Sequence, residues 1–451
     1  MKRFNLIELL SALMLLLFSS CKKTDVEQPG PGEDLSATNK YSTDVLTKWI
    51  NLQTQIMYLK DQTQRPGYDR TLPFRLYSYA GIALYESVVP GMPGYQSLSG
   101  QLTDMPQMPK PEEGKSYHRA ASANAAMAAV HRSLLYGATA ATKLSIDSLE
   151  AALNTQYETE ADAATLQRSI EFGKEVAKRI VEWSETDGSY TAWPPYTPPS
   201  GPGLWVPTPP NNFAARFVHV GDQRTFVPNI LHSIFPPAPP AYSTDPSSTF
   251  YKMEKEVYDA VQNRTPADSL QATYWGANAG RGSPGLQWFA ILKKVIVEQS
   301  VKLDKAVVAY CKMGMAQYDA VVVTFKSQYT YNLLRPITYI RNVMGQTNWL
   351  LPYGGVGAPT PDWPDVSLVE HIAPAKAMSS MFGENYRFNT DGTNPDRYQG
   401  YTFNSFEEAA AHIATAFFLK GITTKPGASV GVDIGSKTVE YIDKKIKFKK
   451  N

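Results

Sequence analysis

The chain has few of the residues that form disulfide bonds or zinc sites. Its 451 residues include only two cysteines, Cys21 and Cys311, and six scattered histidines. Neither a Cys-x-x-Cys pair nor a His-Glu-x-x-His motif occurs, although these are common spacings of zinc ligands. The sequence therefore predicts no metal site built from clusters of cysteine and histidine.

The chain also lacks a strong charge of either sign. It carries 44 basic and 42 acidic residues, a formal net charge of +2, and no basic stripe interleaved with aromatic residues. These features predict that nucleic acid is not a partner. With 43% hydrophobic and 19% charged residues, the composition is that of a globular protein whose length allows one large core or two smaller ones.

No apolar run is long enough for a comfortable membrane span, but the N-terminus resembles a targeting signal. Lys2 and Arg3 precede an apolar stretch at 6–18 that Glu8 interrupts, and residues 17–21 (LFSSC) form a lipobox-like motif. We predict a lipoprotein signal peptide over 1–20, cleavage before Cys21 and a lipid on its thiol. The alternative is an uncleaved hydrophobic anchor.

This N-terminus has two consequences for the mature chain. The protein would lie in the cell envelope, lipid-anchored at the periplasmic or outer-membrane face, with the membrane lipid as one partner. Since Cys21 would carry the lipid, Cys311 would have no cysteine with which to form an intrachain disulfide bond.

The rest of the chain has a helical hydrophobic period. Residues 21–42, which are polar and rich in proline, glycine and acidic residues, are predicted to be a flexible tether. From 73 to 89 the apolar residues recur at steps of four, which predicts an amphipathic helix. No run with a period of two stands out, so the prediction is a single all-α helical-bundle domain over 43–451.

One segment departs from the helical pattern. Residues 191–248 contain many prolines, including WPPYTPP and WVPTPP. Proline fixes φ and removes a hydrogen-bond donor, so this stretch is predicted to be a long ordered loop that wraps the helical core.

A series of motifs is shared, in order and spacing, with one known group of proteins. The chain resembles the superfamily of the vanadium-dependent haloperoxidases and type 2 phosphatidic acid phosphatases, in its bacterial (Bacteroidetes-like) lipoprotein branch. The resemblance implies an all-helical fold and a site for phosphate or vanadate. The motifs are LYSYAGIALYESVVPG (76–91), WSETDG (183–188), WVPTPP (205–210), QYTYNLLRP (328–336), TPDWPD (360–365), FGENY (382–386) and FNSFEEAA (403–410).

The resemblance implies an anion site made by three motifs: Lys-x6-Arg-Pro, Pro-Ser-Gly-His and Ser-Arg-x5-His. Binding a tetrahedral oxyanion needs fixed cations and backbone donors, and turnover also needs histidines that transfer protons or ligate vanadium. Arg335 of the first motif is present, but Gln328 holds the lysine position. In the last motif Phe417 holds the arginine position and Thr423 the histidine position.

The middle motif can be aligned in two ways. Counted from the preceding Trp-Pro-Asp, the histidine is His371, one residue late, and Leu368-Val369 replace Ser-Gly. Counted back from the FG of FGENY, Ser367 holds the histidine position and Asp365-Val366 replace Ser-Gly. Either way the small pair that admits backbone donors to the anion is lost.

Four side chains remain as anion-binding candidates, and each has a simpler interpretation. Arg335 could pair with an acidic neighbour, and Lys326, two residues before Gln328, would face elsewhere on a helix. His371 could be a capping or surface histidine, and Lys420 a solvated lysine. The candidates are Arg335, Lys326, His371 and Lys420.

These substitutions lead to three hypotheses on function. The first, which the substitutions favour, is that the protein is a degenerate member of the superfamily that binds a ligand or partner through the former active site. The alternative is an active vanadium-dependent haloperoxidase or phosphatase with an altered site. A third is that the Pro-rich, aromatic loop contacts glycan. The family implies vanadate as cofactor, but the substituted positions count against it, and the partner remains a small anion, a glycan or a protein.

Overall fold

The computed structural model describes residues 36–58, 72–275, 284–393 and 400–450. The predicted signal peptide, Cys21 and most of the predicted tether lie outside these residues. Within them no helix is both long enough and apolar enough to cross a membrane.

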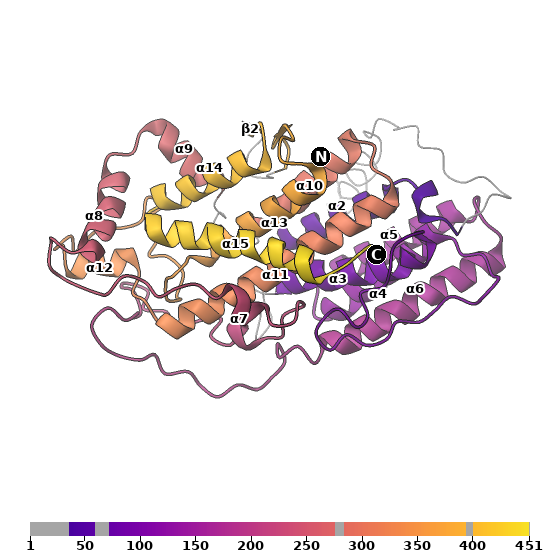
Figure 1. Cartoon of the computed structure of the whole chain (residues 1–451), viewed down its shortest axis with the longest axis horizontal. Coiled ribbons are helices and arrows are strands. Elements are labelled where there is room, and N and C mark those ends of the chain that lie inside the picture. The colour runs from indigo at the N-terminus through magenta and orange to yellow at the C-terminus, as the bar shows by residue number, and fades with distance from the viewer. Residues whose placement is uncertain (1–35, 59–71, 276–283, 394–399, 451) are drawn as a thin grey trace, which may run out of the picture.

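Helices dominate the described chain (Figure 1). They are η1 (Thr38–Lys40), α2 (Asp44–Tyr58), α3 (Leu72–Val88), η3 (Val89–Gly91), α4 (Arg119–Leu134), α5 (Ala140–Tyr157), α6 (Ala163–Ser184), η4 (Val220–Asp222), α7 (Ile230–Ile234), α8 (Thr249–Gln262), α9 (Pro266–Tyr274), η5 (Pro284–Leu286), α10 (Gln287–Glu298), α11 (Leu303–Tyr331), α12 (Pro336–Asn342), α13 (Val366–Phe382), α14 (Phe406–Leu419) and α15 (Lys425–Lys445). A short antiparallel pair, β1 (Phe388–Asn389) and β2 (Thr402–Phe403), aligns Phe388 with Phe403. The prediction of an all-α fold is confirmed.

The long helix α11 is the centre of the bundle. It is buried on nearly all sides, because α3, α13 and α15 pack around it and apolar residues occur on all its faces. One continuous cluster of buried side chains runs from Tyr41 to Ile446. Helices α4, α5 and α6 lie at one end of the molecule, and α8, α9 and α12 at the other (Figure 1).

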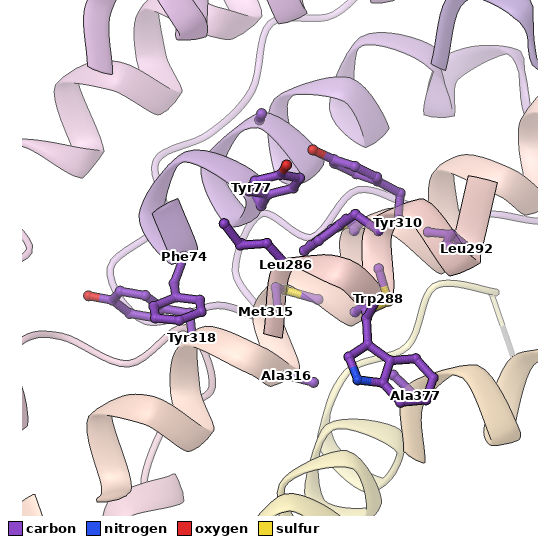
Figure 2. Packing of buried hydrophobic residues seen from close by; sticks show 14 of the residues in the cluster. Phe74, Tyr77, Leu286, Trp288, Leu292, Tyr310, Met315, Ala316, Tyr318 and Ala377 are labelled. Atoms are coloured by element: carbon purple, nitrogen blue, oxygen red, sulfur yellow. The ribbon is translucent and has the colours of Figure 1, made fainter. Parts of the chain in front are cut away.

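Helices α3 and α11 touch backbone to backbone at two glycines. A Cβ atom on Gly81 would lie 3.0 Å from the Cα of Cys311, and one on Gly314 would lie 3.1 Å from the Cα of Ser78. A side chain at either position would press on the facing backbone, so glycine favours this close packing. Beside this contact, Tyr77 and Tyr310 lie close to each other (Figure 2), and their ring centroids are 6.2 Å apart.

The predicted stripe of α3 is confirmed, since Leu76, Ala80, Leu84 and Val88 are all fully buried. The Pro-rich stretch is mostly loop, as predicted, but it also contains the short helices η4 and α7. It wraps the C-terminal end of α11, where the N–H of Trp205 donates to the carbonyl of Asn332 at 2.7 Å.

Candidate functional site

The three motif segments meet at the C-terminal end of α11, as the order of the motifs predicts. Gln328 is on the last turns of α11, and its Nε2 donates to the carbonyl of Pro364 at 2.6 Å. Arg335 immediately precedes α12 and reaches Asp365, which caps α13. The ring centroids of His371 on α13 and Phe417 on α14 are 5.6 Å apart.

Arg335 is a buried cation held by acceptors from one loop. Its Nε donates to the carbonyl of Thr360 at 2.7 Å, and its Nη2 donates to the Thr360 hydroxyl at 2.6 Å and to the carbonyl of Pro361 at 3.3 Å. Its Nη1 donates to Oδ2 of Asp365 at 2.9 Å. Burial opposes the charge, but Asp365 and Asp362 outweigh it, so the pKa of Arg335 is raised.

Asp365 is positioned where an oxyanion could be held. Its Oδ2 accepts from Arg335, and its Oδ1 accepts from the backbone N–H of Ser367 at 2.9 Å, at the start of α13. A guanidinium and a helix N-terminus are the two features that most readily bind oxyanions in proteins. This geometry supports the alignment in which Asp365, Val366 and Ser367 hold the Ser-Gly-His positions.

The other substituted positions are packed into the protein. Phe417 is buried against His371, and Thr423 is fully buried with one long hydrogen bond, 3.4 Å, from its hydroxyl to the carbonyl of Thr424. Gln328 is also buried, and its Oε1 has no hydrogen-bond partner. None of these three side chains carries a charge.

His371 is neither a capping nor a surface residue, so that sequence interpretation is wrong. It lies within α13 and is fully buried; its Nδ1 accepts from Nε1 of Trp288 at 3.1 Å, and its Nε2 lies 3.1 Å from the carbonyl of Trp275. The Nε2–H tautomer satisfies both contacts. Burial lowers the pKa of His371 to about 3, so the ring is neutral and has no charge to offer an anion.

The two candidate lysines are in different surroundings. Lys326 is 45% exposed and pairs with Asp222 of η4, 2.7 Å away, so it faces away from buried Gln328, as the helical offset predicts. Lys420 follows α14, with its Nζ 5.4 Å from the ring centroid of Phe417 and 5.6 Å from that of Tyr353. Burial lowers the pKa of Lys420 to about 8, and the charge of Asp365 offsets part of this shift. Of the four candidates, only Arg335 and Lys420 therefore interact with Asp365.

Sequence reasoning missed a buried carboxylate beside this site. Glu254 on α8 is buried, and none of the described residues forms a hydrogen bond with its Oε2. Burial and the nearby Asp362 raise the pKa of Glu254 well above its usual range, and burial raises the pKa of Asp362 to about 6. The signal was in the sequence: Glu254 follows Phe250 by four residues, on the inward face of an amphipathic helix.

The raised pKa of Glu254 predicts how the stability of the protein depends on pH. The unfolded chain ionises Glu254 near pH 4.5, whereas the folded protein keeps it protonated to a higher pH, so the folded state binds more protons and stability falls as pH rises. Glu254→Gln removes this titration. We compare the free energy of unfolding of the variant with that of the parent protein at each pH. The difference is expected to favour the variant more at pH 8 than at pH 5. Urea unfolding at both pH values is the measurement, and an equal difference at the two values would contradict the assignment.

Comparison with solved structures identifies proteins that share this helical fold. The chain is similar to a bacterial vanadium-dependent iodoperoxidase, with 26% identity and a TM-score of 0.80 over 91% of this chain and 98% of that one. It is also similar to a bacterial vanadium-dependent chloroperoxidase, with 14% identity in both the apo and the holo form. The apo form has a TM-score of 0.62 over 85% of this chain and 96% of that one. The holo form has a TM-score of 0.64 over 94% of this chain and 98% of that one. At that identity they show the fold alone.

The chain therefore has the fold of the vanadium-dependent haloperoxidases, as the motif order predicts. No family model matches it, and no curated protein matches it.

Proposed function

We propose that the protein is a catalytically degenerate haloperoxidase-like domain, held at the cell envelope through Cys21, that uses the fold to bind a ligand or partner. One observation carries the proposal. The carboxylate of Asp365 accepts from both Arg335 and the N-terminus of α13, and so it takes the two kinds of donor that an oxyanion would need.

Vanadate, the cofactor that the superfamily implies, fits this set of residues poorly. The oxyanion would have to displace Asp365 from Arg335, and would then lie near a second carboxylate, Asp362, which interacts electrostatically with the same guanidinium. The positions occupied by Gln328 and Phe417 add no positive charge. An anion beside uncompensated carboxylates is disfavoured by several kcal/mol in a buried site.

The groups that would transfer protons are also missing from the expected places. Thr423 is a buried alcohol without a base bonded to its hydroxyl, and both ring nitrogens of His371 are used within the core. General acid–base assistance contributes roughly 10²–10⁴-fold to catalysis. Without it we expect no appreciable turnover.

The alternative, an active haloperoxidase or phosphatase with an altered site, is favoured by one observation. Lys420 places an ammonium group close enough to Asp365 for the two charges to interact. In this alternative Lys420 would replace the cation that is lost at Phe417.

An assay of the purified mature protein separates the two. With vanadate, peroxide and iodide, bromide or chloride, and separately with a phosphomonoester, we expect no turnover above a protein-free blank. Turnover that requires vanadate, and that is lost in both Arg335→Lys and Lys420→Met, would show that the altered site is active. Lys425→Met is the matched control, because Lys425 pairs with Glu256 on the surface.

A further inference from the structure

A second candidate site lies away from the three motifs of the anion site, at the C-terminal end of the motif over 76–91. A cavity of about 620 Å³ opens between the end of α3 with η3, the loops at 92–99 and 107–111, and Lys450 near the C-terminus. Figure 1 shows the C-terminus on the opposite side of the bundle from α12. Cavities that bind small organic ligands in proteins have volumes of about 300–1,000 Å³.

The walls of this cavity combine apolar and polar side chains and are fixed by hydrogen bonds. Gln96 donates from Nε2 to the carbonyls of Lys447 and Lys449 at 3.0 and 3.2 Å, which ties one wall to the C-terminal segment. The hydroxyl of Ser99 accepts from the N–H of Met108 at 3.2 Å, which ties two loops together. The cavity is therefore preformed. Its apolar lining includes Pro90, Met92, Pro93, Met108, Pro109 and Pro111.

Glu86 places one buried charge on the wall. Its carboxylate accepts from the N–H of Leu98 at 2.6 Å and from the hydroxyl of Ser97, and only about 2% of the residue is exposed. Within the described parts of the chain Glu86 forms no ion pair, and no cation contributes to its pKa, which burial raises to about 7. Lys110 and Lys450 also line the cavity, but both are exposed to solvent at its rim.

We propose that this cavity binds an organic monocation: a primary ammonium group on a compact apolar body, with Glu86 as its counter-ion. A buried carboxylate is stabilised when a cation replaces the water it has lost, and the ammonium donates to the acceptor positions that Leu98 and Ser97 leave open. The proline and methionine walls bury the apolar body. The two rim lysines repel a second positive charge, which favours a monocation over a polyamine.

The first experiment compares three probes of the same shape on the full mature protein. Calorimetry or ligand-observed NMR at pH 8 should show binding of benzylamine, at least tenfold weaker binding of benzyl alcohol, and no binding of benzoate. This order follows from the charge of Glu86, since a hydrogen bond to a charged group contributes about 1.5–3 kcal/mol, or roughly 10–100-fold in affinity. Equal binding of benzylamine and benzyl alcohol, or no binding of either, would overturn the proposal.

The second experiment tests Glu86 itself. Glu86→Gln keeps an acceptor for Leu98 and should weaken the binding of benzylamine at least tenfold. Glu112→Gln, at an exposed position, should leave the affinity for benzylamine unchanged. In the parent protein the affinity should fall by up to tenfold for each pH unit below about 7, because an incoming cation needs the ionised carboxylate. An affinity that is independent of pH would also overturn the proposal, and this measurement does not depend on whether the variant folds. Met108→Trp, which fills the cavity, should abolish binding.

Discussion

Asp365→Ala is expected to lower the free energy of unfolding by about 3–5 kcal/mol, the cost of removing one partner of a buried ion pair. The substitution leaves the buried guanidinium of Arg335 without its carboxylate, and it also removes the N-cap of α13. The measurement is urea unfolding at pH 7, with tryptophan fluorescence as the signal.

Two further variants control this prediction. Asp433→Ala breaks an exposed pair with Lys437, whose side chains are 61% and 51% exposed, and should change stability by less than about 1 kcal/mol. Arg335→Met combined with Asp365→Ala should recover part of the loss, because no unpaired charge is then buried. If Asp365→Ala is as harmless as Asp433→Ala, the pair does not hold the site together.

Restoring the superfamily motifs is expected to restore weak binding of vanadate or phosphate. Gln328→Lys, Phe417→Arg and Thr423→His return the lysine, arginine and histidine of the outer motifs, and the contact between Arg335 and Asp365 favours rebuilding the middle motif at 365–367. The full set adds Asp365→Ser, Val366→Gly and Ser367→His. It removes the internal carboxylate and supplies two cations and backbone access to the oxyanion. Calorimetry with vanadate is the measurement.

The decisive control keeps Asp365 and restores the other five positions. We expect this variant not to bind vanadate, because the carboxylate still pairs with Arg335. Equal binding by both variants would show that Asp365 does not compete with the oxyanion. A folded six-position variant that fails to bind would show that the site has been remodelled beyond these motifs. Stability has to be measured alongside, because Phe417 is buried against His371 and an arginine there needs a new partner.

The fold could be predicted from the sequence because its signals are local. The four-residue spacing in α3 and the order of the motifs each depend on residues close together in the chain. The same holds for Lys326, whose direction follows from the helical offset relative to Gln328. These predictions needed no knowledge of which helices pack together.

The site could be predicted only in part because its key contacts join distant residues. The sequence leaves the register of the middle motif open between two alignments, and the pairing of Arg335 with Asp365 favours one of them. His371 was misjudged because its burial depends on Trp275 and Trp288, which the sequence does not place next to it. Glu254 was overlooked because its raised pKa comes from burial in the folded protein and from Asp362, more than a hundred residues further along the chain.

The close contact of α3 with α11 lies apart from the candidate anion site. Gly81 and Gly314 fix the two helices at mid-length, whereas Gln328 and Arg335 lie at and beyond the C-terminal end of α11. Substitutions at that end leave this glycine contact in place, and the pairing of Asp365 with Arg335 links the starts of α13 and α12 there. In the degenerate member that we propose, selection for a stable fold would keep Arg335 through its pairing with Asp365, so that the presence of this arginine alone would not indicate activity.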